Sequence, residues 1–395
     1  MSSPADRPFT CFLVAGEESG DRLGAGLMRA LALKCGGDVR FRGVGGRDMA
    51  AEGLPSLFPI DDLAIIGFAA IPRRAPKILR HIREVADAVI AAPPDVLVII
   101  DSPDFTHRVA RRVRRALPSL PIVDYVSPSV WAWRPGRAAA MRAYVDHVLA
   151  LLPFEPEVHA RLGGPPCTYV GHPMVEQIAS LRPSPEEARQ RLADPPRVLL
   201  LAGSRTAEVR RLLELFKATF ELVAAEAGPL EIVLPTVPHL AARVNDAVAG
   251  WALRPRVVVE PGEKWAAFRA ARAALAASGT VSLELALAGV PTVIAYKVPL
   301  FEELIARALI QVPSIVLANL VLGENAIPEL LQRQATPQNL ARAVMPLLAD
   351  TPERRRQVEA FDRLDKIMEI GTTSPSEKAA DVVLKIARAR ASLAP

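Results

Sequence analysis

The chain has 395 residues, which is too long for one ordinary hydrophobic core and suits two α/β domains of roughly 150 to 200 residues each. Half of the residues are hydrophobic and 23% are charged, a composition that excludes a largely disordered chain. The formal net charge of +5 suits anionic ligands or an anionic membrane surface, and it is too small to indicate a nucleic-acid partner.

Cysteine, histidine and apolar patterns exclude further classes of protein. The three cysteines show no CxxC spacing, so neither a zinc site nor a disulfide framework is indicated. The six histidines include no HExxH motif, so we expect no bound metal and no cofactor. The sequence shows no signal peptide and no run of 18 apolar residues free of charges and helix breakers, which predicts a cytoplasmic protein.

Short apolar runs alternate with longer helical patterns along the chain. They lie at 11–15, 96–100, 121–126 and 148–152, and then at 198–202, 231–235, 257–260, 274–278 and 292–296. Continuous apolar runs between helices are typical of parallel strands that are covered on both faces. The fold class is therefore α/β, with two doubly wound parallel sheets of about six and about five strands. Two such sheets in tandem predict a ligand cleft between their carboxyl edges.

The best domain boundary lies beside the segment LRPSPEEARQRLADPP, in which two prolines flank Ser184 at an expected helix start. We expect residues 1–180 to form the first domain and residues 181–349 to form the second. Helices in 350–395 are expected to return to the first domain.

A glycine-rich and acidic segment, AGEESGDRLGAGLMRAL, follows the first apolar run at 15–31. Its spacing is not GxGxxG, so the dinucleotide-binding fingerprint is absent. A loop at a strand's carboxyl end still lines the crevice, which makes Glu17, Ser19, Gly20 and Asp21 candidates for a contact there. Capping of the next helix explains Ser19 or Asp21 equally well.

Residues 63–85 place apolar residues beside a basic cluster. Exposed apolar groups next to cations suit an anionic lipid surface. The residues concerned are Ile65, Ile66, Phe68, Ile71, Ile78 and Leu79, with Arg73, Arg74, Lys77, Arg80 and Arg83. An amphipathic helix that buries Ile78 and Leu79 in the core is at least as good an explanation.

Asp101 directly follows the apolar run 96–100, at the carboxyl end of an expected central strand. A carboxylate at this position could serve as a general base. The competing interpretation is that Asp101 or Ser102 caps a helix that begins at Pro103.

The segment YVSPSVWAWRPGR, at 125–137, contains two of the four tryptophans of the chain. Its prolines stiffen it, and Ser127 can donate a hydrogen bond. Trp131 and Trp133 should point in opposite directions, one toward packing and the other toward an acyl chain or a sugar. Farther along, His172 in VGHPM is either a hinge residue, which we favour, or a donor in the cleft.

Two turns of the second domain have the character of phosphate-binding loops. One contains Gly203, Ser204 and Arg205, and Arg205 could reach a diphosphate with its fork of donors. The other places Ser278, Gly279 and Thr280 at a helix N-terminus, and Glu284 on the same helix face as Thr280 could bind ribose hydroxyls. Ordinary N-capping, with Glu284 as a surface acid, is an equally good explanation of the second loop.

These segments together resemble the lipid-A-disaccharide synthase family, which are glycosyltransferases of the GT-B type with two Rossmann-like domains. The matching segments span nearly the whole chain in order: LVAGEESGDRLGAGLMRAL, VIIDSPDF, YVSPSVWAWR, LLPFEPEV, YVGHPM, AGSRTAEV, ASGTVSLELALAGVPTVIAYK and PELLQ. The resemblance assigns the catalytic aspartate to Asp101, the diphosphate contact to Arg205, the ribose contact to Glu284 and a nucleotide-site asparagine to Asn319.

The resemblance also implies a reaction. It is the transfer of 2,3-diacylglucosamine from UDP-2,3-diacylglucosamine to the 6-hydroxyl of 2,3-diacylglucosamine 1-phosphate, with inversion, to give the β-1,6 disaccharide of lipid A and UDP. Both substrates carry acyl chains, which implies peripheral association with the anionic inner membrane through residues 63–85. A homodimer is left open.

The chain departs from the family pattern in three places. It has AGSR where PGSR is usual, Ala318 before Asn319 where proline is usual, and no Gly-Arg-Glu before PELL, which leaves Glu324 and Asn325 without a role. The alternatives are another UDP-sugar enzyme of the same fold, such as a UDP-N-acetylglucosamine 2-epimerase or the peptidoglycan glycosyltransferase, and a noncatalytic lipid-binding relative.

Overall fold

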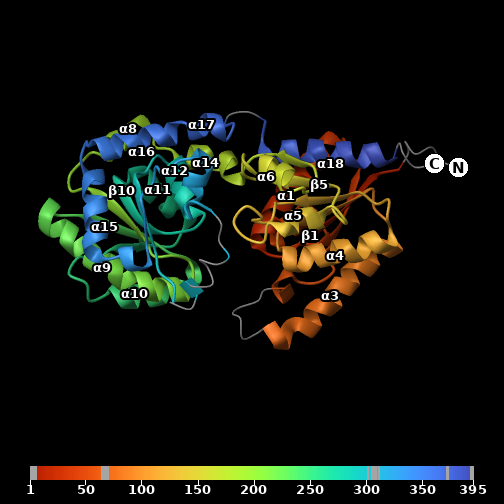
Figure 1. Ribbon diagram of the computed structural model, residues 1–395, viewed down its shortest axis with the longest axis horizontal. Helices are drawn as coiled ribbons and strands as arrows, with labels where there is room; N and C mark the ends of the chain where they lie inside the picture. The colour runs from red at the N-terminus through yellow and green to blue at the C-terminus, as the bar shows by residue number, and fades with distance from the viewer. Residues whose placement is uncertain are drawn as a thin grey trace. The chain divides into compact units, whose positions relative to one another are not determined.

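The computed structural model describes residues 7–63, 71–299, 302–303, 309, 312–370 and 373–391. The chain forms two compact units (Figure 1). Unit 1 comprises Met1–Pro173 with Gly371–Pro395, and unit 2 comprises Met174–Ile370. Each unit has its own six-stranded parallel sheet, which confirms the α/β fold class expected from the sequence.

The sheet of unit 1 has the strand order β2-β1-β3-β4-β5-β6. Its strands are β1 (Phe9–Ala15), β2 (Val39–Val44), β3 (Val96–Ile100), β4 (Ile122–Tyr125), β5 (His147–Ala150) and β6 (Cys167–Tyr169). Its helices are α1 (Glu18–Lys34), α2 (Arg47–Ala51), α3 (Ile71–Ala91), α4 (Pro103–Ala116), α5 (Gly136–Met141), α6 (Glu155–Arg161) and α18 (Pro375–Ala391), with a 3₁₀ helix at Ile60–Leu63. The strand order reverses between β1 and β3, so the crevice of this sheet lies at the carboxyl ends of these two strands.

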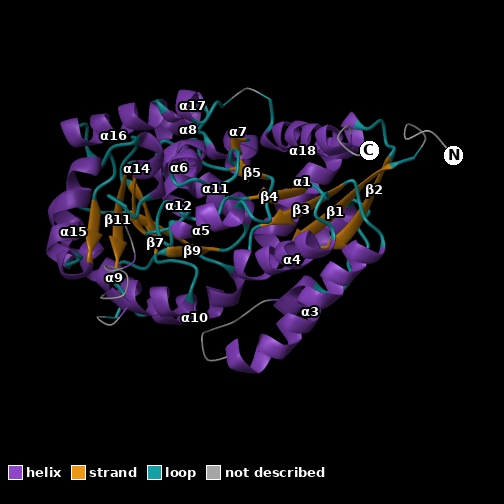
Figure 2. Cartoon of the chain, turned by 45° about the vertical axis from the view of Figure 1, so that its right-hand side comes forward, coloured by secondary structure: helices purple, strands orange, loops and turns teal. Residues whose placement is uncertain are grey.

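The core of unit 1 lies on both faces of the sheet, because successive strand residues point to opposite sides. Val98 and Ile100 of β3 pack with α1 and α18, whereas Leu97 and Ile99 pack with α3 and α4. Figure 2 shows α18 on one side of these strands and α3 and α4 on the other. A strand that is buried on both faces has a continuous run of apolar residues in the sequence. The run at 96–100 therefore predicted β3 correctly.

The sheet of unit 2 has the strand order β12-β11-β10-β7-β8-β9. Its strands are β7 (Arg197–Leu201), β8 (Glu231–Pro235), β9 (Arg256–Val258), β10 (Ala273–Ala277), β11 (Thr292–Tyr296) and β12 (Glu329–Leu331). Its α-helices are α7 (Ile178–Leu181), α8 (Pro185–Gln190), α9 (Thr206–Ala227), α10 (Ala241–Val248), α11 (Pro261–Ala270), α12 (Val281–Leu287), α14 (Leu317–Leu322), α15 (Pro337–Val344), α16 (Pro352–Asp362) and α17 (Leu364–Ile367). In the described part of the chain, 3₁₀ helices also lie at Pro173–Gln177, where the chain passes into this unit, and at Pro238–Leu240, Gln332–Gln334 and Met345–Leu348. The order reverses between β7 and β10, so their carboxyl ends form the crevice of this unit.

The C-terminal helices divide between the units at a different residue from the expected one. The sequence predicted that 350–395 return to the first domain, but in the structure α16 contacts unit 2, where the Gln357 side chain bonds both backbone groups of Thr292. The last helix, α18, packs on α1 of unit 1, with an ion pair of 2.8 Å between Lys34 Nζ and Asp381 Oδ1. The first boundary lies after Pro173, seven residues before the expected position.

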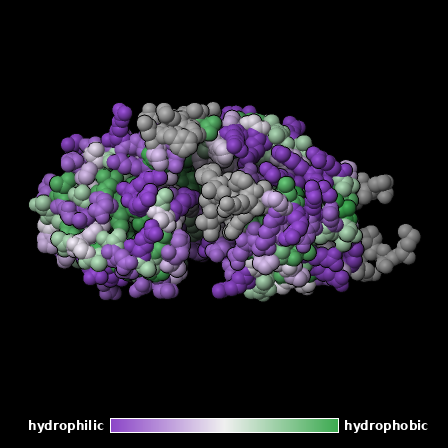
Figure 3. Space-filling model, turned by 90° about the horizontal axis from the view of Figure 1, so that it is seen from below, coloured by the Kyte–Doolittle hydropathy of each residue, from purple (hydrophilic) through white to green (hydrophobic). Residues whose placement is uncertain are grey.

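No helix in the described part of the chain is long and apolar enough to span a membrane. The face seen in Figure 3 mixes hydrophilic and hydrophobic residues in small areas.

Candidate functional site

Asp101 lies at the crevice of unit 1, immediately after β3. Asp101 and Ser102 both adopt positive φ, at 53° and 46°, which is strained for residues other than glycine. The Asp101 amide donates to the Tyr125 carbonyl (3.0 Å), and the Ser102 amide donates to Asp101 Oδ1 (2.7 Å). Ser102 is the N-cap residue of α4, and its side chain makes no capping bond. The Asp101 carboxylate therefore does not cap α4. It is held at the carboxyl end of β3.

The loop after β1 packs against this carboxylate. Ser19 Oγ donates to Asp101 Oδ2 at 3.5 Å, and Ser102 Oγ donates to Glu17 Oε1 at 3.0 Å. Gly16 permits the contact, because a Cβ there would lie 2.4 Å from the Cβ of Ser102. Of the candidates in 15–31, the structure thus brings Glu17 and Ser19 to Asp101.

The surroundings of Asp101 favour its protonated form. Burial raises the pKa of the Asp101 carboxyl above its ordinary value, and the negative charge of Glu17 raises it further, while the Ser102 amide opposes both. A carboxylate with a raised pKa is a stronger base than an ordinary aspartate, so this group can accept a proton from a bound hydroxyl.

Asp21 and Gly20 have internal roles. The Asp21 carboxylate is 4% exposed and accepts the amides of Gly46 (2.7 Å), Asp48 (2.9 Å) and Met49 (3.1 Å), so it caps α2. Gly20 lets α1 approach β3, since a Cβ there would lie 3.3 Å from the Ile100 carbonyl oxygen. The crevice role that the sequence suggested for these two residues therefore gives way to packing and capping.

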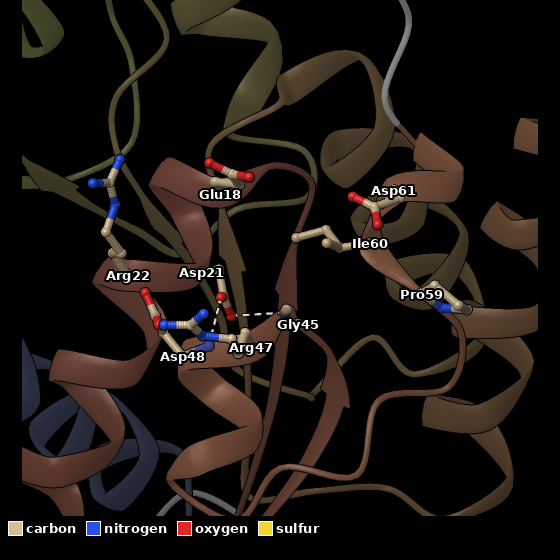
Figure 4. A pocket seen from close by; sticks show the side chains of 10 residues that line it. Glu18, Asp21, Arg22, Gly45, Arg47, Asp48, Pro59, Ile60 and Asp61 are labelled. Atoms are coloured by element: carbon tan, nitrogen blue, oxygen red, sulfur yellow. Dashed lines mark hydrogen bonds between the residues drawn. The ribbon is translucent and has the colours of Figure 1, made fainter. Parts of the chain in front are cut away.

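A pocket of about 560 Å³ opens above this cap (Figure 4). Besides Asp21, its charged lining residues are Arg22 and Arg47, with Glu18, Asp48 and Asp61. The excess of carboxylates disfavours an anionic group, and we assign no ligand to this pocket.

The tryptophan segment after β4 turns one ring inward and one outward. Trp131 packs edge-on against Phe154, with 5.4 Å between ring centroids, and its Nε1 donates to Glu155 Oε1 at 3.1 Å. Trp133 is 36% exposed, and the guanidinium of Arg134 lies 4.3 Å from its ring centroid. Trp131 is therefore the packing residue, and Trp133 is the one available to a ligand.

Two further candidates of unit 1 are buried. Ser127 Oγ lies 2.8 Å from His159 Nε2 and also donates to the Pro128 carbonyl, so its hydroxyl is used internally. His172 precedes the unit boundary at Pro173, and burial lowers its pKa to about 4. The imidazole is therefore neutral at pH 7, which does not suit a cationic donor.

Unit 2 has a pocket of about 320 Å³ at the carboxyl ends of β7 and β10, where its strand order reverses. The pocket brings together both phosphate-type loops and the acid predicted to follow them. Its lining residues are Leu201, Gly203, Ser204, Arg205, Glu208, Pro235, Thr236, Val237, Lys264, Ala277, Ser278, Gly279, Thr280, Val281 and Glu284. We call it the donor pocket.

One wall of the donor pocket is the start of α12. The N-terminus of a helix carries the positive end of its dipole and attracts phosphate. In α12 the amides of Ser282 and Leu283 already donate to the Gly279 and Thr280 carbonyls, at 3.1 and 3.0 Å. Gly279 and Thr280 are exposed there, and a Cβ on Gly279 would meet no atom within 4 Å. Ser278 Oγ instead donates to the Ile315 carbonyl at 2.8 Å, so this hydroxyl holds the loop.

Each charged residue predicted for the donor pocket has a partner that the sequence did not suggest. Arg205 NH1 donates to Glu208 Oε1 at 2.8 Å, and Lys264 Nζ donates to Glu284 Oε2 at 2.6 Å. The Lys264 ammonium also lies 4.3 Å from the ring centroid of Trp265. Spacing could have indicated Glu208, three residues after Arg205 on one helix face, whereas nothing in the local sequence indicates Lys264.

Asn319 has a structural task. It is 2% exposed, its Nδ2 donates to the Ile327 carbonyl (2.9 Å) and to Ser314 Oγ (3.3 Å), and its Oδ1 accepts the Ile327 amide (2.9 Å). The side chain thus ties the segment before α14 to the segment after it, and it does not line the donor pocket.

The basic and apolar segment lies partly outside the described residues. Ile66 and Phe68 fall there, and the side chains of Ile71, Arg73 and Arg74 at the start of α3 are likewise not described. Ile78 packs against the core, whereas Leu79 is 45% exposed. The core-helix explanation therefore holds for Ile78 and fails for Leu79.

Among the described residues, no group of three or more histidine, cysteine, aspartate and glutamate side chains could hold a metal ion.

Comparisons with known proteins cover nearly the whole chain. A family model described as lipid-A-disaccharide synthetase matches residues 11–386. The chain is 62% identical to the lipid-A-disaccharide synthase of Nitrobacter hamburgensis over 374 residues, which are 95% of this chain and 94% of that protein. It is 44% identical to the synthase of Rhodospirillum centenum over 382 residues, which are 96% of this chain and 95% of that protein.

Solved structures with the same fold are more distant in sequence. UDP-GlcNAc 2-epimerase from Neisseria meningitidis, bound to UDP-GlcNAc, has a TM-score of 0.62 at 11% identity and covers 95% of this chain and 100% of its own. MurG from Acinetobacter baumannii has a TM-score of 0.56 at 17% identity, with coverage of 96% and 99%. At these identities the likeness shows the fold alone.

Proposed function

The chain belongs to the lipid-A-disaccharide synthase family, and we propose from this premise that it joins two acylated glucosamines into the β-1,6 disaccharide of lipid A. The family makes it a glycosyltransferase. The proposed donor is UDP-2,3-diacylglucosamine, and the proposed acceptor is 2,3-diacylglucosamine 1-phosphate. The family match does not favour an epimerase, the peptidoglycan glycosyltransferase or a noncatalytic relative.

The observation that carries the donor assignment is the donor pocket of unit 2. The first turn of α12 and Arg205 line one space with Glu284, which combines phosphate-binding and hydroxyl-binding groups. In the proposed complex, the α12 amides and Arg205 take the diphosphate and Glu284 accepts hydrogen bonds from the ribose. The same positive groups then stabilise the charge that develops on UDP as it leaves.

Asp101 is the proposed general base. It removes the proton from the 6-hydroxyl of the acceptor as that oxygen attacks the anomeric carbon of the donor. The bond between this carbon and the UDP oxygen breaks, and the configuration inverts. The raised pKa of Asp101 and its hold by Ser19 and Ser102 support this role.

The exposed part of α3 is proposed to dock on the anionic cytoplasmic face of the inner membrane. Leu79 is 45% exposed, and Lys77, Arg80 and Arg83 beside it are also exposed. An apolar group among cations matches the boundary between acyl chains and anionic headgroups. Docking there would let the enzyme take up both acylated substrates.

A product assay tests the proposal. The purified protein is incubated with both acylated substrates, and mass spectrometry should detect the disaccharide and UDP. Asp101→Asn should keep UDP binding and lose about 100-fold or more in turnover, the usual contribution of a general base. UDP-sugar binding without product would identify a noncatalytic relative, and near-normal turnover of the variant would remove Asp101 from its role.

A further inference from the structure

Glu208 is a buried carboxylate in the wall of the donor pocket, on the first turn of α9. It is 7% exposed and accepts three hydrogen bonds. They come from Arg205 NH1 at 2.8 Å, from the Arg205 amide at 3.4 Å and from the Tyr296 hydroxyl at 3.5 Å. The shortest bond goes to the guanidinium, which is the group that faces the proposed diphosphate.

Arg205 depends on this contact for its orientation. Its side chain is 78% exposed, and among the described residues it makes no hydrogen bond or ion pair except with Glu208. An exposed arginine otherwise samples many rotamers, and fixing it costs conformational entropy when a ligand binds. A guanidinium has five N–H donors, so one bond to Glu208 leaves four for phosphate oxygens.

The backbone before α9 is built around the same carboxylate. A Cβ on Gly203 would lie 2.5 Å from Glu208 Oε2, and Gly203 has a φ of 102°. Glycine therefore leaves the space that Glu208 occupies, in a conformation that other residues seldom adopt. The glycine and the glutamate together support Arg205, which lies between them in the sequence.

We propose that Glu208 is a positioning residue of the transfer reaction: it holds the Arg205 guanidinium in the orientation that receives the nucleoside diphosphate, and it does not contact the ligand itself. The inference rests on the proposed function of the donor pocket. It predicts that the effect of Glu208 on nucleotide binding passes through Arg205. A purely structural cap of α9 would act whether or not Arg205 is present.

The test is a double-mutant cycle on the full chain, with calorimetric binding of UDP as the measurement. Glu208→Ala should weaken UDP binding about tenfold, equivalent to about 1.4 kcal/mol. Glu208→Gln, which keeps an acceptor oxygen without the charge, should weaken it less. In an Arg205→Ala background, the change at Glu208 should alter UDP affinity less than about twofold. The KM for the acceptor should stay constant throughout.

Glu231→Gln is the matched control, because Glu231 forms a 2.8 Å ion pair with Arg197 in the same unit and lies outside the donor pocket. It should leave UDP affinity unchanged. Equal losses in both Arg205 backgrounds would overturn the inference in favour of a structural cap. Unchanged or tighter UDP binding by Glu208→Ala would also overturn it, since relief of charge repulsion would then dominate. A wild-type chain that does not bind UDP would overturn the proposed donor pocket as well.

Discussion

Among the described residues of unit 1, burial raises the pKa of two carboxyl groups, Asp101 and Glu155, and their contacts show that they have different roles. Asp101 lies at the sheet crevice beside Glu17 and Ser19, where a hydroxyl can reach it. Glu155 is 3% exposed, and its oxygens accept the Leu152 amide and the Trp131 indole N–H. Asp101 is therefore suited to proton transfer, whereas Glu155 stabilises the tryptophan segment by accepting the Trp131 indole N–H.

The charge of Glu17 offers a direct test of the base. This carboxylate raises the pKa of Asp101, so Glu17→Gln should lower that pKa while keeping an acceptor for Ser102 Oγ. A base must be ionised to act, so the acidic limb of the profile of kcat/KM against pH should move to lower pH. On the plateau above this limb, where the base is ionised in both proteins, the rate should change less than about twofold.

The matched control is Glu18→Gln, because Glu18 is exposed in the first turn of α1 and is not among the main causes of the raised pKa of Asp101. Its profile should overlay that of the wild type. An acidic limb that stays in place in Glu17→Gln would show that another group limits the rate.

Glu155 should make the stability of unit 1 depend on pH. Burial raises its pKa from 4.5 to about 7, so the folded state binds this proton more tightly than the unfolded state. The resulting stabilisation is complete below pH 4.5 and is lost as the pH rises through 7. Relative to Glu155→Gln, the wild type should therefore lose on the order of 3 kcal/mol of unfolding free energy between these limits.

Urea unfolding from pH 4.5 to 8, followed by hydrogen exchange of unit 1 amides, measures this difference. His159 and His172, whose pKa burial lowers, contribute with the opposite sign but equally in both proteins. Glu157→Gln, an exposed change on the same helix, should run parallel to the wild type. A constant difference between wild type and Glu155→Gln would show that folding does not raise the pKa of Glu155.

Strands and the residues at their ends could be predicted from the sequence, because burial on both faces leaves a continuous apolar run. Asp101 was found in this way, as the residue that directly follows β3, and Arg205 was found in the turn that joins β7 to α9. The short edge strand β12 was not counted, because three partly buried residues give no such run.

Hydrogen-bond and ion-pair partners that come from distant segments of the chain could not be predicted from the sequence. Asp21 caps a helix 25 residues away, and Lys264 pairs with an acid 20 residues away. Periodicity reports which face of an element is buried, and it carries no information about which polar groups meet across the fold. Asn319 is a related case: the family resemblance marked the position, but only the structure shows that its amide closes a loop.

The helix α3 is the element on which membrane attachment can be tested. Its residues Ile82, Val85 and Val89 are buried, so the helix stays anchored in unit 1 when its exposed side is changed. Leu79→Glu removes the exposed leucine side chain from the solvent-facing side of α3 and places a negative charge among the cations there. Binding to vesicles that contain phosphatidylglycerol should fall at least about tenfold, as measured by sedimentation.

Leu33→Glu is the control for this change, because Leu33 is 79% exposed and lies on α1 and not on α3. It should sediment with vesicles like the wild type. If Leu79→Glu also sediments like the wild type, α3 is an ordinary amphipathic helix and the membrane contact lies elsewhere.

The whole molecule divides its chemistry between two independently cored units. Unit 1 holds the carboxylate that we propose as the general base, and unit 2 holds the pocket that we propose for the nucleoside diphosphate. Each feature lies where the strand order of its own sheet reverses. A nucleotide without the sugar should therefore act on unit 2 alone.

Hydrogen exchange with saturating UDP tests this division of labour. At 100 times its dissociation constant, a ligand that binds only the folded state stabilises it by about 2.7 kcal/mol. Slower exchange should appear in the amides of 203–208 and 278–284, which form the donor pocket, while those of 16–21 and 101–106 keep their rates. Arg205→Ala should reduce the protection at the same UDP concentration, since it removes a charge-assisted donor to the diphosphate. Protection of 101–106 without protection of 278–284 would place the nucleotide in unit 1 and reverse the assignment of donor and acceptor, because the helix N-terminus of α12 would then be unused.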